Sequence, residues 1–190
     1  MTFRLTRSRL AAAAVTTVVA GALAISASPA SADIDSGSVS GGGDFTNDWG
    51  DEGEISQSRY ADSNATCLWQ QILWAEGAEE SNGTPYDASD IDGMFGPNTV
   101  HATKDLQERW PLKYVDGKVG NETWGYADSN LSFYDYAYEY AFGGKILRYS
   151  GDARTFYLVR AANGSYVFWE GSTNDNGNYR FATYTRRTCG

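Results

Sequence analysis

The sequence predicts an α+β protein in which a three-helix module is followed by a small antiparallel β-meander. A phrase of the form Asp-Gly-x-x-Gly-x-x-Thr occurs at residues 92–99 and again at 116–123. A repeated turn that runs into a helix start indicates a duplicated helical unit. After residue 131, aromatic and polar side chains alternate between glycine-containing turns. That alternation is typical of strands.

Residues 1–32 have the features of a signal peptide. Three arginines within the first nine residues precede an apolar stretch over 10–25, and Ala-Ser-Ala ends at Ala32. The apolar stretch is too short to span a bilayer, so we expect cleavage rather than a retained anchor. The mature chain is then secreted.

The charge and the cysteines narrow the class of protein further. The whole chain carries a formal net charge of −9, and loss of the basic leader makes it more acidic. Such a chain is a poor partner for nucleic acid or for anionic membranes.

Cys67 and Cys189 both lie in the exported part, where a disulfide between them is the leading expectation. Two free or intermolecular thiols are the alternative.

The segment 33–58 is expected to be a flexible linker. It is rich in Gly, Ser and Asp and contains few apolar side chains. Little apolar burial is available there to offset the entropy of ordering. The spacing of Phe45, Trp49 and Ile55 does not indicate where these residues would pack.

Three helices are expected within a module over 59–130. Ser63 or Asn64 can cap a helix over 65–77 that stops at Gly77. A polar loop over 78–90 precedes a second helix over 97–110, which Pro111 ends. A short helix over 121–127 closes the module.

The region 131–190 is expected to form five antiparallel strands. Tyrosines alternate with other residues over 134–140, and further strands are predicted at 145–149, 155–161, 165–170 and 179–186. Asn163-Gly164 predicts a type I′ hairpin turn. The tyrosine stripe has two interpretations: a buried sheet face, which we favour, or a stacking surface for sugar rings.

From about residue 60 to 128 the chain resembles the peptidoglycan-binding domain of bacterial cell-wall hydrolases. Trp69-Gln70, Leu73 and Gly77 match the first element of the family pattern, and the two Asp-Gly phrases match the rest in register. The motif positions are Asp92, Gly93, Phe95, Gly96, Thr99, Gln107, Asp116, Gly117, Val119, Gly120, Thr123 and Trp124. A longer loop over 78–90 and the β-rich tail depart from the family.

The resemblance implies a domain that binds the glycan or the stem peptide of the wall without cleaving it, and a location outside the cell or on its wall. The motif residues are expected to form turns and core rather than contacts with ligand. The expected ligand contacts are Gln70, Tyr86, Asp90, Asn98 and Tyr114. No cofactor and no metal are expected.

A catalytic function is not expected from the chemistry of the chain. His101 is the sole histidine and falls inside the second helix, whereas a zinc peptidase site commonly needs two or three histidines. The first alternative is a wall hydrolase that uses carboxylates of the tail, with Glu139 and Glu170 as the pair. The second is a secreted interaction or inhibitor protein, in which the module is a scaffold and the tail binds another secreted protein.

Overall fold

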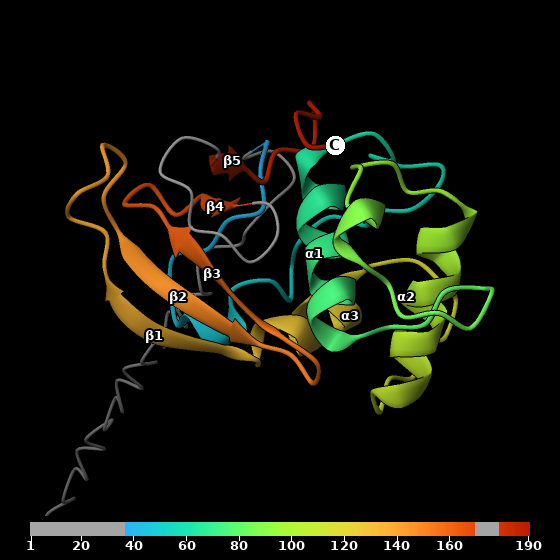
Figure 1. The fold of residues 1–190 in the computed structure, drawn as a ribbon. Coiled ribbons are helices and arrows are strands. Elements are labelled where there is room, and N and C mark those ends of the chain that lie inside the picture. The colour runs from blue at the N-terminus through green and yellow to red at the C-terminus, as the bar shows by residue number, and fades with distance from the viewer. Residues whose placement is uncertain (1–36, 170–178) are drawn as a thin grey trace, which may run out of the picture.

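Helix α1 (Asn64–Glu76) lies between two other helices and a β-sheet in the computed structural model, which describes residues 37–169 and 179–190 (Figure 1). The Ser63 hydroxyl accepts a hydrogen bond from the backbone N–H of Thr66 and begins the helix. Gly77 ends it with a left-handed φ of 62°. Every residue of α1 is buried, so this helix has no face toward solvent.

The other two long helices follow the repeated turns. Helix α2 (Pro97–Arg109) and helix α3 (Asn121–Asp128) confirm the expected positions within one residue at each end. Pro97 occupies the first turn of α2, where a missing N–H costs nothing. Short 3-10 helices form at Phe45–Asn47 and Ala88–Asp90. Within 37–169 and 179–190, no helix has the length and apolar character needed to cross a bilayer.

The five strands form one sheet in chain order, with every neighbouring pair antiparallel. They are β1 (Leu131–Tyr136), β2 (Lys145–Ser150), β3 (Thr155–Arg160), β4 (Tyr166–Trp169) and β5 (Tyr179–Phe181). Alternate residues such as Leu147, Leu158 and Phe168 join α1 in the main core, and Val159 and Val167 belong to a second apolar cluster. The α+β class and the meander are therefore confirmed.

Several strand details differ from expectation. Strand β1 ends at Tyr136 rather than near residue 140, and β5 ends at Phe181 rather than at 186. In the hairpin after β3, Gly164 has φ of 91° but Asn163 is not in the positive-φ region. The Gly164 N–H donates to the carbonyl of Ala161. A type I′ turn requires two positive φ angles, so that expectation is wrong.

The expected burial of the tyrosine stripe is also wrong for three of its four members. Tyr134, Tyr136 and Tyr138 are exposed, whereas Tyr140 packs beside the second apolar cluster. The register of β1 shifts between Phe133 and Asp135, which breaks the period of two. Because β1 is an edge strand, its far end extends past the core.

The segment 37–58 is packed into the core and is not a flexible linker. Val39, Trp49 and Ile55 are completely buried. The Val39 N–H donates to Ala182 O at 2.8 Å beside β5, and Ile55 exchanges two backbone hydrogen bonds with Val119 in the helical module. The linker expectation rested on the polar composition of the segment. Its few apolar residues are nevertheless buried, each against a part of the chain distant in sequence.

Acidic side chains of the same segment are buried with partners. Asp48 Oδ2 lies 2.6 Å from Arg160 Nη1 and accepts a hydrogen bond from the Tyr166 hydroxyl at 2.7 Å. Glu52 accepts hydrogen bonds from the Ser40 N–H and from the Tyr184 hydroxyl. These contacts satisfy charges that would otherwise oppose burial.

A disulfide joins Cys67 in α1 to Cys189 near the end of the chain, which confirms the expected pairing. The Asn64 N–H donates to Arg186 O at 2.7 Å, and the Thr188 N–H donates to Asn64 Oδ1 at 2.8 Å. The last residues are therefore attached to the start of α1 by one covalent bond and several hydrogen bonds.

Replacing Trp49 by Ala should destabilise the protein by about 3–5 kcal/mol, because a large buried aromatic leaves a cavity that closes only in part. Trp49 packs edge-on against Trp124 and Tyr166, with ring centroids 5.6 and 5.0 Å away. Urea unfolding followed by circular dichroism measures the change. A free energy of unfolding equal to that of the wild type would restore the linker interpretation.

Glu52 should make the protein less stable as the pH rises. Burial raises the pKa of Glu52 from 4.5 to about 7, so the folded state holds an extra proton between these values. The contribution of Glu52 to stability is therefore complete below pH 4.5 and falls, by about 3 kcal/mol, toward pH 7. Glu52→Gln should flatten the pH profile of the melting temperature.

The surface variant Glu108→Gln serves as the control for that pH profile. Burial also raises the pKa of Asp128, to about 6, so the wild type and both variants share this contribution. A Glu52→Gln profile as steep as that of Glu108→Gln would contradict the assignment.

Candidate functional site

The two Asp-Gly phrases form turns of the same geometry. Gly93 and Gly117 have φ angles of 70° and 74°, a region that side chains rarely adopt. Asp92 Oδ1 accepts a hydrogen bond from the Met94 N–H at 2.8 Å, and Asp116 Oδ1 accepts one from the Lys118 N–H at 2.9 Å. Each aspartate therefore closes its own turn and leads the chain into the next helix.

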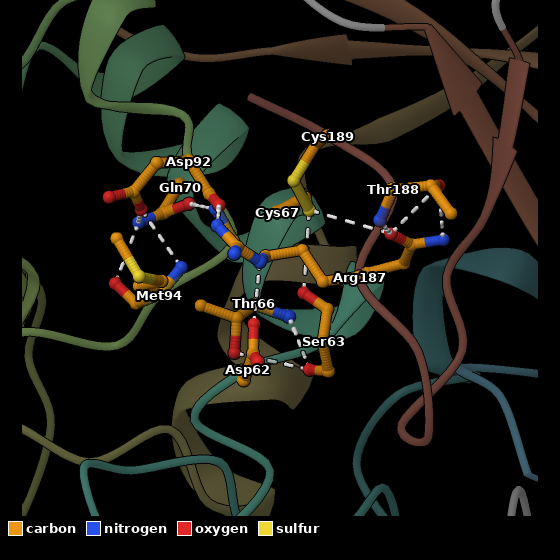
Figure 2. The surroundings of a disulfide bond; sticks show 12 residues. Asp62, Ser63, Thr66, Cys67, Gln70, Asp92, Met94, Arg187, Thr188 and Cys189 are labelled. Carbon is orange, nitrogen blue, oxygen red and sulfur yellow. Dashed lines mark hydrogen bonds and ion pairs between the residues drawn. A yellow bond between two sulfur atoms is a disulfide. The ribbon is translucent and has the colours of Figure 1, made fainter.

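The side chain of Gln70, in α1, lies between Asp92 and Met94 of the first turn (Figure 2). Its Oε1 accepts from the Gly93 N–H at 2.6 Å, and its Nε2 donates to Asp92 Oδ1 at 2.8 Å and to Met94 O at 3.1 Å. Gln70 is itself buried. Its amide is thus engaged by the turn, although sequence reasoning placed Gln70 among the ligand contacts.

Gln107 of α2 holds the second turn in the same way. Its Oε1 accepts from the Gly117 N–H at 2.9 Å, and its Nε2 donates to Lys118 O at 2.7 Å and to Thr123 Oγ1 at 3.0 Å. The duplication therefore includes a buried glutamine for each turn. The sequence signal for this equivalence was the occurrence of Gln after an apolar residue in both helices.

A cavity of about 290 Å³ opens beside the first turn, and we call it the first cavity. Four of the five predicted ligand contacts line it, namely Gln70, Tyr86, Asp90 and Asn98. The other lining residues are Ser89, Asp92, Met94, Gly96, Pro97 and Thr99. Residues from α1, from the 78–90 loop and from the start of α2 thus meet at one place.

The floor of the first cavity is a fixed hydrogen-bonded group. The Tyr86 hydroxyl lies 3.0 Å from Asp90 O and 3.2 Å from Thr99 Oγ1. Burial raises the pKa of Tyr86, so its hydroxyl stays neutral. The long loop that departs from the family pattern therefore supplies a rigid aromatic wall rather than a loose insertion.

The rim of the first cavity carries the Asp90 carboxyl group and the Asn98 amide, and Glu80 lies behind them as a partner of Asn98. Asn98 Nδ2 donates to Glu80 Oε1 and lies 3.4 Å from Asp90 Oδ1. Burial, together with the nearby charge of Glu80, raises the pKa of Asp90. Hydrogen bonds from Thr84 and Asn98 lower the pKa of Glu80. The rim can therefore hydrogen-bond to hydroxyl and amide groups of a ligand.

A larger cavity of about 480 Å³ lies beside the second turn, and we call it the second cavity. Tyr114, the fifth predicted contact, lines this cavity and is thus separate from the other four. Lys113 Nζ sits 4.8 Å from the centroid of the Tyr114 ring. Lys118 Nζ lies 3.7 Å from a carboxylate oxygen of Glu54. The two cavities therefore differ in charge although their turns are equivalent.

The end of the chain supports the first turn from the opposite side to Gln70 (Figure 2). Arg187 Nη1 donates to Asp92 O at 2.9 Å, and Arg187 Nε lies 2.6 Å from Asp62 Oδ1. A Cβ atom on Gly93 would come within 2.7 Å of both disulfide sulfurs. The sequence did not indicate a role for Arg187. The one signal for it was its position two residues before Cys189, whose disulfide brings the end of the chain to the module.

Two of the three residues considered for catalysis, His101 and Glu139, lie within the described part of the chain. His101 is exposed on α2, with Nδ1 3.2 Å from Glu79 O. Glu139 is exposed in the connection after β1, and Glu170 lies outside the described residues. Within 37–169 and 179–190, no group of three or more His, Cys, Asp or Glu side chains could hold a metal ion.

Comparison with known families identifies the helical module. Residues 70–125 match the family described as a putative peptidoglycan binding domain. The match contains both turns, both glutamines and every lining residue of the first cavity, and it confirms the resemblance found in the sequence. The segments on either side of it, including the sheet, lie outside the match. No curated protein and no solved structure shows significant similarity to the chain.

Replacing each buried glutamine by Ala should loosen only its own turn. Each substitution leaves a buried Gly N–H without its acceptor, at a cost of about 1–3 kcal/mol. Amide hydrogen exchange should therefore speed up over 92–99 in Gln70→Ala and over 116–123 in Gln107→Ala. Each variant is the control for the other. Equal exchange at both turns in both variants would contradict the assignment.

Proposed function

We propose that this is an exported, non-catalytic protein that binds cell-wall peptidoglycan through the first cavity. The observation that carries the proposal is the meeting of Tyr86, Asp90 and Asn98 in one hollow of a module that matches the peptidoglycan-binding family. Small pockets with a few convergent polar groups are the usual form of a ligand site.

The chemistry of the first cavity suits wall fragments. Amide and hydroxyl groups of amino sugars and short peptides can donate to the carboxyl oxygens of the rim and to the amide oxygen of Asn98. The protein as a whole is acidic, and other anionic wall polymers would repel it. Short-range hydrogen bonds inside a cavity are compatible with that repulsion, because salt screens charges beyond about 10 Å.

Export is supported by two features of the chain. The first 32 residues have the composition of a leader, although they lie outside the described residues. The Cys67–Cys189 disulfide is of the kind that persists in oxidising compartments. Both features agree with a location outside the cell or on its wall.

Asn98→Ala should weaken the binding of insoluble peptidoglycan about tenfold, since losing one buried hydrogen bond costs about 1.4 kcal/mol. Cosedimentation of the purified protein with peptidoglycan measures the affinity. Tyr114→Ala is the matched control, because it removes an exposed side chain of the second cavity and should leave binding unchanged.

The same samples test the alternatives. Soluble fragments that are released by the wild type but not by Glu139→Gln or Glu170→Gln would identify a hydrolase and overturn the non-catalytic assignment. Loss of binding in Tyr114→Ala with none in Asn98→Ala would move the site to the second cavity. Neither sedimentation nor release would remove the wall hypothesis and indicate a secreted protein partner.

A further inference from the structure

Strand β1 and the turn after it expose a row of aromatic side chains that the helical module does not explain. Phe133, Tyr134, Tyr136 and Tyr138 are 46, 56, 48 and 83 % exposed, and we call these four residues the tyrosine platform. Among the described residues, strand β1 is an edge strand of the sheet, on the side of the molecule away from α2 (Figure 1). A contiguous patch of exposed aromatic side chains often marks a binding surface.

Three rings of the platform support one another, and the fourth packs on a neighbouring strand. The centroids of Phe133 and Tyr136 are 5.1 Å apart, and those of Tyr136 and Tyr138 are 5.3 Å apart with planes inclined by 26°. Tyr134 packs at 4.7 Å against Tyr157 on β3. Because neighbouring rings limit each other's rotation, the platform loses little side-chain entropy when a ligand binds.

A hollow of about 330 Å³ adjoins the platform and carries hydrogen-bonding groups. Asp135, Tyr136, Tyr138, Glu139, Tyr140 and Ile146 line it. One oxygen of Asp135 accepts from the Tyr136 N–H at 2.7 Å. Among the described residues, neither Asp135 nor Glu139 forms a salt bridge, so carboxylate oxygens remain open to a ligand.

The mixture of flat rings and acceptors selects the class of ligand. A protein partner would call for an apolar centre depleted of charge, whereas here two carboxylates and the phenol hydroxyls interrupt the aromatic surface. Sugar rings combine apolar C–H faces, which stack on aromatic rings, with hydroxyls at their edges. The acidic charge of the chain disfavours anionic polymers, so the fitting sugar chain is neutral.

We propose that the tyrosine platform is a second binding site, which takes a neutral glycan chain. It lies outside the family match and uses residues distinct from those of the first cavity. The proposal therefore goes beyond the function proposed for the module and does not depend on it. Two sites on one protein would hold a wall polymer more tightly than either alone, because the second contact forms at high effective concentration.

The test is titration of the purified protein with N-acetylchitotetraose, a peptide-free sugar chain, by isothermal calorimetry. The double variant Tyr136→Ala/Tyr138→Ala should weaken binding about tenfold or more, since it removes the stacking surface. Tyr136→Phe/Tyr138→Phe keeps the rings and should retain most of the affinity. Because these side chains are exposed, the melting temperatures of the double phenylalanine and double alanine variants should both be close to that of the wild type.

Asn98→Ala separates this site from the first cavity. It should leave N-acetylchitotetraose binding unchanged even where it weakens the sedimentation of peptidoglycan. Absence of oligosaccharide binding by the wild type, or full binding by the double alanine variant, would overturn the proposal. So would a dimer in sedimentation velocity that disappears in the double alanine variant, because the platform would then be occupied by a second copy of the chain.

Discussion

The complete burial of α1 is the constraint on which the rest of the structure depends. A helix with no exposed face must have apolar neighbours all round, and the module supplies only part of them. Its polar residues must also find partners, and three of them hold different segments. Gln70 holds the first turn, Asn64 holds the end of the chain, and Glu76 accepts from the Tyr149 hydroxyl of β2 at 2.7 Å.

This arrangement makes the helical module and the sheet parts of one structure. A single apolar cluster contains residues of α1, α2 and α3 together with residues of every strand from β1 to β4. The segment 37–58 pairs with Ala182 beside the sheet and with Val119 in the module, so it joins the two from a third direction. Sequences outside the family match therefore complete the surroundings of the helical module.

Local chemistry accounts for the parts of the fold that could be predicted from sequence. Caps such as Ser63 and Gly77, and the Asp-Gly turns, act within a few residues. Four of the five candidate contacts line one cavity, but only Asp90 and Asn98 lie near the first turn in sequence. The packing of Trp49 and the contact of Arg187 with Asp92 could not be predicted, because both join segments far apart in sequence. The tyrosines were misjudged because their alternation does not reveal that β1 is an edge strand with a shifted register.

Gly93 and Gly117, the positive-φ glycines of the two repeated turns, differ in the atoms that a Cβ would meet. A Cβ on Gly117 would meet the side chains of Val100 and Lys104, and the long lysine chain can move aside. A Cβ on Gly93 would meet the two sulfurs of a covalent bond that joins two distant segments. The two turns share one motif, but residues near the end of the chain pack against the first turn only. A side chain at either glycine would strain the backbone, and one at Gly93 would also have to displace a covalent bond.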